Sequence, residues 1–106
     1  MKTIVRSSIF AAALAGLMTT ATAAAPTKLK GAELASMAKI NLATARMTAL
    51  KARPGTITDQ ELEKEKGGSG LRYSFDITSK GKPFEVGVDA KTGVVLENAA
   101  EGKNPD

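Results

Sequence analysis

The side chains of this sequence that are best placed to take part in chemistry are carboxylates, Asp76 and Glu85, in two neighbouring segments that are expected to be strands. Residues 71–89 alternate between apolar and polar types on both sides of Lys80 and Gly81. Such alternation around a glycine-containing turn is typical of a half-buried antiparallel hairpin. With Lys80 and Gly81 as a two-residue turn, Asp76 lies directly opposite Glu85 on the polar face. Like charges in this position destabilise a strand pair, so they require an explanation.

Further carboxylates alternate along residues 56–66 and would share one face if that segment is a strand: Glu61, Glu63 and Glu65. Grouped carboxylates could hold a cation, because Ca²⁺ and Mg²⁺ prefer oxygen ligands, or they could meet a basic partner. The candidate acidic patch comprises Asp76, Glu85, Glu61 and Glu63. The alternative is a solvated acidic face that is screened by nearby cations, namely Arg72, Lys64 and Lys82.

Catalysis is not predicted. The chain has no His and no Cys, so it lacks the commonest general base, the commonest zinc ligands and a thiol nucleophile. The glycine-rich stretch 67–70 has neither the lysine of a phosphate loop nor the setting of a dinucleotide site. We therefore predict a protein that is not an enzyme, with no catalytic residue, no cofactor and no metal site other than the acidic patch.

Charge is distributed unevenly along the chain, with a basic first part and an acidic second part. In residues 24–53 a single acid, Glu33, accompanies the basic side chains Lys28, Lys30, Lys39, Arg46, Lys51 and Arg53. Residues 54–106 carry seven basic and ten acidic side chains. Nucleic-acid binding would need basic and aromatic residues together, whereas the aromatic residues beyond position 23 all lie in the acidic half. Nucleic acid is therefore excluded as a partner.

The elements that would position the carboxylates follow from the apolar pattern. The hairpin register gives three apolar pairs: Ile77 with Phe84, Phe75 with Val86, and Tyr73 with Val88. A shift by one residue would break all of them, so these side chains are expected to form the core. Asn41 is a candidate N-cap for a helix over residues 42–51, whose small apolar face would pack on the sheet: Leu42, Ala45 and Ala49.

Several boundaries stay open. Residues 31–38 favour a short helix, but one continuous helix over residues 32–52 is the alternative. Propensity in residues 56–66 favours a helix from Asp59 onward, whereas a hairpin needs a third strand to be stable in water. Residues 67–70 are expected to be a flexible connector. A tight turn at 89–93 and a short strand at 94–96 follow.

The first residues have the pattern of an export signal. Lys2 and Arg6 precede an apolar run over residues 9–18, and small residues end at Ala23. The run is about half of the ~20 residues that a membrane-spanning helix needs. We expect cleavage after Ala23, a periplasmic or secreted product, and no stable membrane insertion after cleavage.

Five stretches, in this order and spacing, resemble the PepSY domain family: residues 40–45, 49–55, 61–63, 73–77 and 85–95. The resemblance covers residues 38–98. It implies that residues 56–65 form a strand and that a helix packs on a small antiparallel sheet. It brings no catalytic residues, and the family is named for propeptides of secreted metallopeptidases.

The expected organisation is a signal peptide (1–23), a lead or short helix (24–37), a PepSY-like domain (38–98) and a polar tail (99–106). The expected fold class is α+β, with one main helix, either alone or with a short helix before it, packed on three to four antiparallel strands. Two functions compete. One is a binding module that regulates or inhibits a peptidase or binds another envelope protein, and the other is an accessory protein that binds a cation or small ligand through its acidic face.

Overall fold

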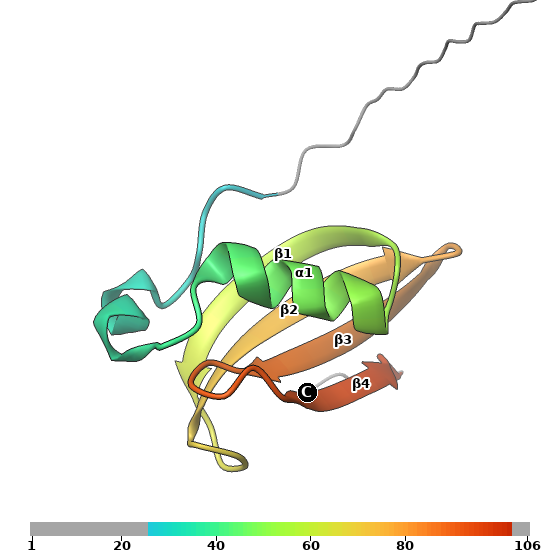
Figure 1. The fold of residues 1–106 in the computed structure, drawn as a ribbon. Coiled ribbons are helices and arrows are strands. Elements are labelled where there is room, and N and C mark those ends of the chain that lie inside the picture. Colours follow the sequence, from blue (N-terminus) through green and yellow to red (C-terminus); the bar gives the residue numbers. More distant parts are fainter. Residues whose placement is uncertain (1–25, 103–106) are drawn as a thin grey trace, which may run out of the picture.

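A computed structural model describes residues 26–102, so the expected signal peptide and the last residues of the expected tail lie outside it. One helix lies across one face of a four-stranded antiparallel sheet of order β1-β2-β3-β4 (Figure 1). The elements are η1 (a 3-10 helix, Ala32–Met37), α1 (Leu42–Ala52), β1 (Thr56–Lys64), β2 (Leu71–Ser79), β3 (Lys82–Asp89) and β4 (Val95–Ala100). The predicted α+β fold class is confirmed.

The central hairpin of β2 and β3 has the predicted register. Lys80 and Gly81 form the turn with φ angles of 53° and 79°. Positive φ at both central residues matches the right-handed twist of the flanking strands. The three apolar pairs form as expected, and Asp76 lies opposite Glu85. The apolar side chains of this hairpin therefore face α1, while the alternate side chains face away from it.

The segment before the sheet forms two helices and not one. Ala38 is extended, with φ −81° and ψ 147°, and this ends η1. The Asn41 carboxamide oxygen accepts a hydrogen bond from the backbone N–H of Thr44 at 2.8 Å, which confirms the predicted N-cap. Ala45 and Ala49 are completely buried, so α1 approaches the sheet closely through its alanine face.

The core consists of the fully buried apolar residues between α1 and the sheet: Ala45, Ala49, Ile57, Leu62, Leu71, Tyr73, Phe75, Ile77, Val86, Val88 and Ala90. The expectation that Phe84 also lies in this core is wrong. Phe84 is only half-buried, near the hairpin turn, where α1 has ended. The Arg53 guanidinium covers its ring instead, 3.8 Å from the centroid. Arg53 follows α1 directly, so this contact lies at the end of the core and leaves part of the Phe84 ring uncovered.

Residues 56–64 form strand β1, against their helical propensity. Ile57, Gln60 and Leu62 are buried in it, and a register shift between Ile57 and Asp59 keeps the apolar residues on the α1 side. The N-terminal lead covers the outer edge of β1. The backbone N–H of Lys30 donates to the Gln60 carbonyl at 3.2 Å, and the N–H of Leu62 donates to the Lys30 carbonyl at 2.7 Å.

Strand β4 is longer than the sequence predicts, and it includes the first residues of the expected polar tail. Val95–Ala100 pairs with β3, and Glu97 lies opposite Gly87. The backbone N–H of Glu101 then donates to the Pro83 carbonyl at 3.0 Å. The prediction fails because residues 97–100 contain no large apolar side chain that would indicate a strand, whereas backbone pairing with β3 needs none.

Candidate functional site

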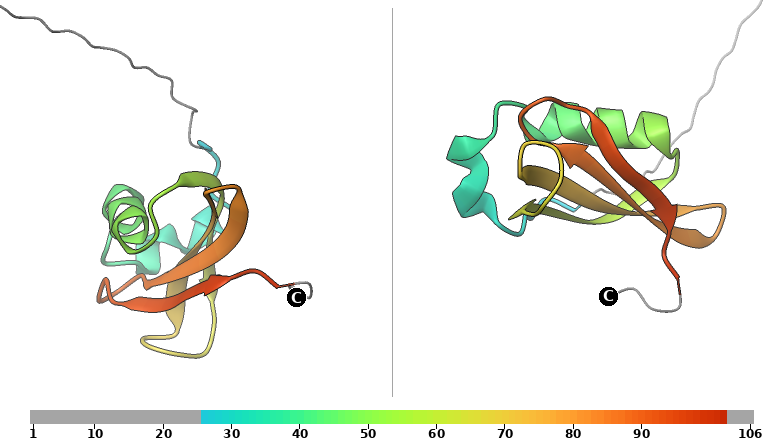
Figure 2. Two further views of the ribbon diagram at one scale, coloured as in Figure 1. Left: turned by 90° about the vertical axis from the view of Figure 1, so that its right-hand side faces the viewer. Right: turned by 90° about the horizontal axis from the view of Figure 1, so that it is seen from below.

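The candidate site is the face of the sheet opposite α1, which no described element covers (Figure 2). We call it the open face. By strand alternation and register its charged residues are Asp59, Glu61, Glu63, Arg72, Asp76, Glu85, Asp89 and Glu97, with Glu101 just beyond β4. Many of the alternating strand positions on this side are thus acidic, whereas most of those on the α1 side form the core. The predicted acidic patch lies within the open face.

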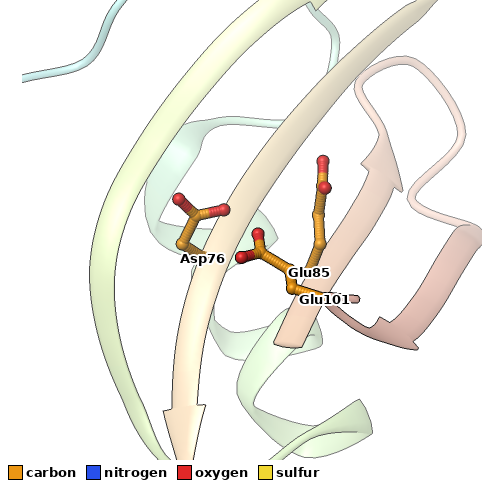
Figure 3. Close-up of side chains that lie close together, drawn as sticks. All are labelled: Asp76, Glu85 and Glu101. Atoms are coloured by element: carbon orange, nitrogen blue, oxygen red, sulfur yellow. The ribbon is translucent and has the colours of Figure 1, made fainter. Parts of the chain in front are cut away.

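Three carboxylates converge at one end of the open face (Figure 3). Asp76 of β2, Glu85 of β3 and Glu101 each offer an oxygen, and these oxygens lie within 4.8 Å of one another. The sequence predicted the first two. It missed Glu101 because the strand was expected to end early, although Glu97 and Glu101 alternate correctly for a longer one. We call these three residues the carboxylate triad.

The other two predicted patch residues lie on the same face but outside the triad. Glu61 lies opposite Ser74, and Glu63 lies opposite Arg72. The Ser74 hydroxyl donates to the Glu63 carboxylate at 2.7 Å. The Glu63 carboxylate is therefore fixed by a hydrogen bond from the neighbouring strand, β2. Glu65, which was expected to share this face, follows the end of β1, and its carboxylate is 3.8 Å from the Arg72 guanidinium.

The screening cations are not those that the sequence suggested, apart from Arg72. The Arg72 guanidinium is 3.3 Å from the Glu97 carboxylate, and the Lys30 ammonium is 3.1 Å from that of Asp59. Lys64 and Lys82 form no ion pair in residues 26–102, because strand alternation places both on the α1 side. No basic side chain in the described region therefore forms an ion pair with the carboxylate triad.

The protonation equilibria of the triad reflect its burial first and the repulsion among its carboxylates second. Burial raises the pKa of Glu85 to about 7, and repulsion from Glu97, Asp76 and Glu101 adds to the shift. Burial also raises the pKa of Asp76, with further repulsion from Glu101 and Asp59. A cation or a basic side chain brought to this place would displace protons and relieve the repulsion.

A second polar cluster, which the sequence analysis did not anticipate, joins two loops at the other end of the sheet. Asp89 is buried and accepts hydrogen bonds from the N–H of Ser69 at 2.6 Å and its hydroxyl at 2.8 Å. It also accepts the N–H groups of Lys91 and Thr92, at 2.8 and 3.0 Å. The turn at 89–93 was predicted, but the connector 67–70 is anchored to it. This cluster is structural.

The triad gives stability an unusual dependence on pH. Glu85 has a pKa of about 7 when folded against an ordinary value of 4.5, so the folded state binds more protons between these values. Stability should therefore fall as pH rises from about 5 to about 8. Replacing Glu85 by glutamine should remove most of this fall and raise the melting temperature at pH 8 by about 2–5 °C. Melting curves from pH 5 to 8 test this.

Glu33→Gln, a variant outside the open face, serves as the control and should keep the dependence of the wild-type protein. The account of the triad would be wrong if Glu85→Gln lowered the melting temperature at pH 8 while leaving the pH profile unchanged.

Comparison with known proteins agrees with this architecture. A family model described as "Peptidase propeptide and YPEB domain" (PepSY) matches residues 39–98, more than half of the chain. The chain belongs to the PepSY family. No curated protein and no solved structure matches it. The PepSY match runs from the residue after Ala38 to β4 and therefore contains α1, nearly all of the sheet and most of the open face.

The family description names peptidase propeptides, with which PepSY domains are often linked. Within residues 26–102, no helix of the PepSY protein is long and apolar enough to cross a membrane.

Proposed function

We propose that this PepSY protein is a non-enzymatic, exported binding module whose open face docks on a peptidase and regulates or inhibits it. The observation that carries the proposal is the uncovered acidic face of the sheet. Asp59, Glu61, Asp76 and Glu85 lie there at neighbouring register positions, and the counter-charges are Lys30 and Arg72. A protein surface with basic side chains would be complementary to this face.

A partner is more readily bound by the open face than by adding a strand to the β1 edge of the sheet. The N-terminal lead already pairs with Gln60 and Leu62, so the middle of the β1 edge is occupied. The two carboxylates with raised pKa, Asp76 and Glu85, lose little hydration on docking because both are already half-buried. Docking of a basic partner should accordingly weaken as salt concentration rises.

Export is part of the same proposal. Residues 1–23 would direct the chain to the periplasm or the exterior and be removed after Ala23. Residues 24–37 would then lead into the PepSY domain, and a polar tail would follow it. The basic start at Lys2 and Arg6 and the apolar run over residues 9–18 support this. N-terminal sequencing of the protein recovered from native cells tests it, and an intact Met1 would contradict it.

The regulatory role can be tested with purified protein. Residues 24–106 should slow the degradation of fluorescent casein by peptidases that native cells secrete. The variant Glu61→Gln/Asp76→Asn/Glu85→Gln, which is neutralised on the open face, should lose this effect. A control variant in which two acids outside the face are neutralised, Glu33→Gln/Glu65→Gln, should keep it. Equal degradation rates with and without the wild-type protein would contradict a role in inhibition.

A second candidate function, cation binding, rests on the carboxylate triad. Oxygens of Asp76, Glu85 and Glu101 within 4.8 Å of one another could share one divalent ion. Calorimetric titration with calcium, magnesium and manganese distinguishes this candidate. Binding heat and a raised melting temperature at millimolar metal, both abolished by Asp76→Asn, would support it. No heat and no change in melting temperature would exclude it.

A further inference from the structure

A cavity of about 620 Å³ lies on the α1 side of the sheet, next to the turn between β2 and β3. It lies where α1 ends and the chain turns into β1, on the opposite side of the sheet from the open face. Its lining consists of Arg53, Pro54, Gly55, Ser79, Lys80, Lys82 and Phe84. We call it the basic cavity. It is independent of the proposed peptidase contact.

The charge of the basic cavity is uncompensated. Arg53, Lys80 and Lys82 line it, and no carboxylate does. In the described part of the chain, none of the three forms an ion pair within 4.0 Å. The acidic side chains of β2 and β3 project from the other face of the sheet. An anion that entered the cavity would therefore meet three cations that form no ion pair with any described carboxylate.

The guanidinium of Arg53 is held in position before any ligand arrives. Its Nε donates to the Asn98 carboxamide oxygen at 3.1 Å, and the Asn98 carboxamide nitrogen donates to the Ala52 carbonyl at 3.1 Å. The guanidinium also lies 3.8 Å from the centroid of the Phe84 ring. These contacts leave the terminal nitrogens of Arg53 without a hydrogen-bond partner in residues 26–102. Pre-positioning reduces the entropy cost of binding.

The cavity also has an apolar part. Phe84 is half-buried, and Pro54 adds a second ring to the lining. The turn is tight at Gly55, where a Cβ atom would overlap the Thr78 carbonyl oxygen, so the wall next to Pro54 is fixed by backbone packing. A few polar groups beside apolar surface are typical of small-molecule sites.

We propose that the basic cavity binds a small amphipathic anion, in which a phosphate or carboxylate group is attached to an aromatic or aliphatic group. The anionic group would contact Arg53 and Lys82, and the apolar group would pack on Phe84 and Pro54. Both parts are needed, because exposed cations alone bind small anions weakly in salt solution.

The test uses phenyl phosphate as the probe, with the protein (residues 24–106) observed by two-dimensional ¹H–¹⁵N NMR. We expect saturable shifts of the backbone signals of Gly55, Lys82 and Phe84. Inorganic phosphate and phenol, which each supply one half of the probe, should bind about tenfold more weakly or not at all. Arg53→Gln and Lys82→Gln should each weaken phenyl phosphate binding by about tenfold.

Lys64→Gln is the matched control, because Lys64 is an exposed β1 lysine that does not line the cavity; it should leave the affinity unchanged. Lys82→Gln keeps the test decisive if Arg53→Gln fails to fold, since Lys82 is exposed and makes no ion pair in the described region. The proposal is overturned if no saturable shift occurs, if inorganic phosphate binds as well as phenyl phosphate, or if only vesicles of anionic phospholipid shift these signals.

Discussion

Replacing Asp89 by alanine is expected to destabilise the domain by about 3–4 kcal/mol. The substitution removes the acceptor of four hydrogen bonds and leaves the N–H groups of Ser69, Lys91 and Thr92 without it. A domain of this size has a total stability of only about 5 kcal/mol or slightly more, so the variant should keep only about 1–2 kcal/mol and unfold at a clearly lower temperature than the wild-type protein. Urea unfolding followed by circular dichroism measures the loss.

Asp89→Ala should also change how the stability of the domain depends on pH at acidic pH. Burial alone would raise the pKa of Asp89, but the hydrogen bonds from Ser69, Lys91 and Thr92 outweigh it and hold the pKa well below its usual range. Asp89 therefore stabilises the fold above about pH 4, and this contribution is lost as pH falls further. Asp76→Asn, which also removes one negative charge, is the control and should not destabilise. Equal stability of Asp89→Ala and wild type would refute the structural role.

Replacing Phe75 by alanine should cost about 3–5 kcal/mol. Phe75 is completely buried at the centre of β2, opposite Val86 and next to Gln60 on β1. The substitution leaves a cavity beneath α1 that the completely buried Ala45 and Ala49 cannot fill. Thermal unfolding should show a melting temperature lower by at least about 15 °C, or no cooperative transition.

Phe84→Ala provides the matched comparison, since both residues are phenylalanines of the same hairpin. Phe84 is only half-buried and its ring faces Arg53, so this variant should lose less than half as much stability as Phe75→Ala. Similar losses for the two variants would mean that the core extends to the hairpin turn, contrary to the burial seen here.

Local patterns explain why the hairpin could be derived from the sequence. Alternation in β2 and β3 has period two, and a two-residue turn at Lys80 and Gly81 permits one register only, which also fixed the pairing of Asp76 with Glu85. The N-cap at Asn41 could also be predicted, because it depends on residues within one helical turn.

Contacts between segments that are distant in the sequence could not be predicted from such local patterns. Glu101 joins Asp76 and Glu85 only because β4 continues to Ala100 along β3, and few apolar side chains mark that continuation. The hydrogen bonds from Ser69 to Asp89 connect two loops whose compositions merely indicate turns. Helical propensity misleads in β1, where burial of Ile57 and Leu62 decides in favour of a strand.

We propose above that a peptidase docks on the open face. Site-specific photo-crosslinking in native cells tests it most directly, with p-benzoylphenylalanine placed either at Glu61 on the open face or at Met47. Met47 is 68% exposed on α1, on the opposite side of the molecule, and serves as the matched position. The expected result is one discrete adduct from position 61, containing a peptidase, and lost when Asp76→Asn and Glu85→Gln are added. Adducts of the same proteins from position 47, or none from position 61, would contradict the account.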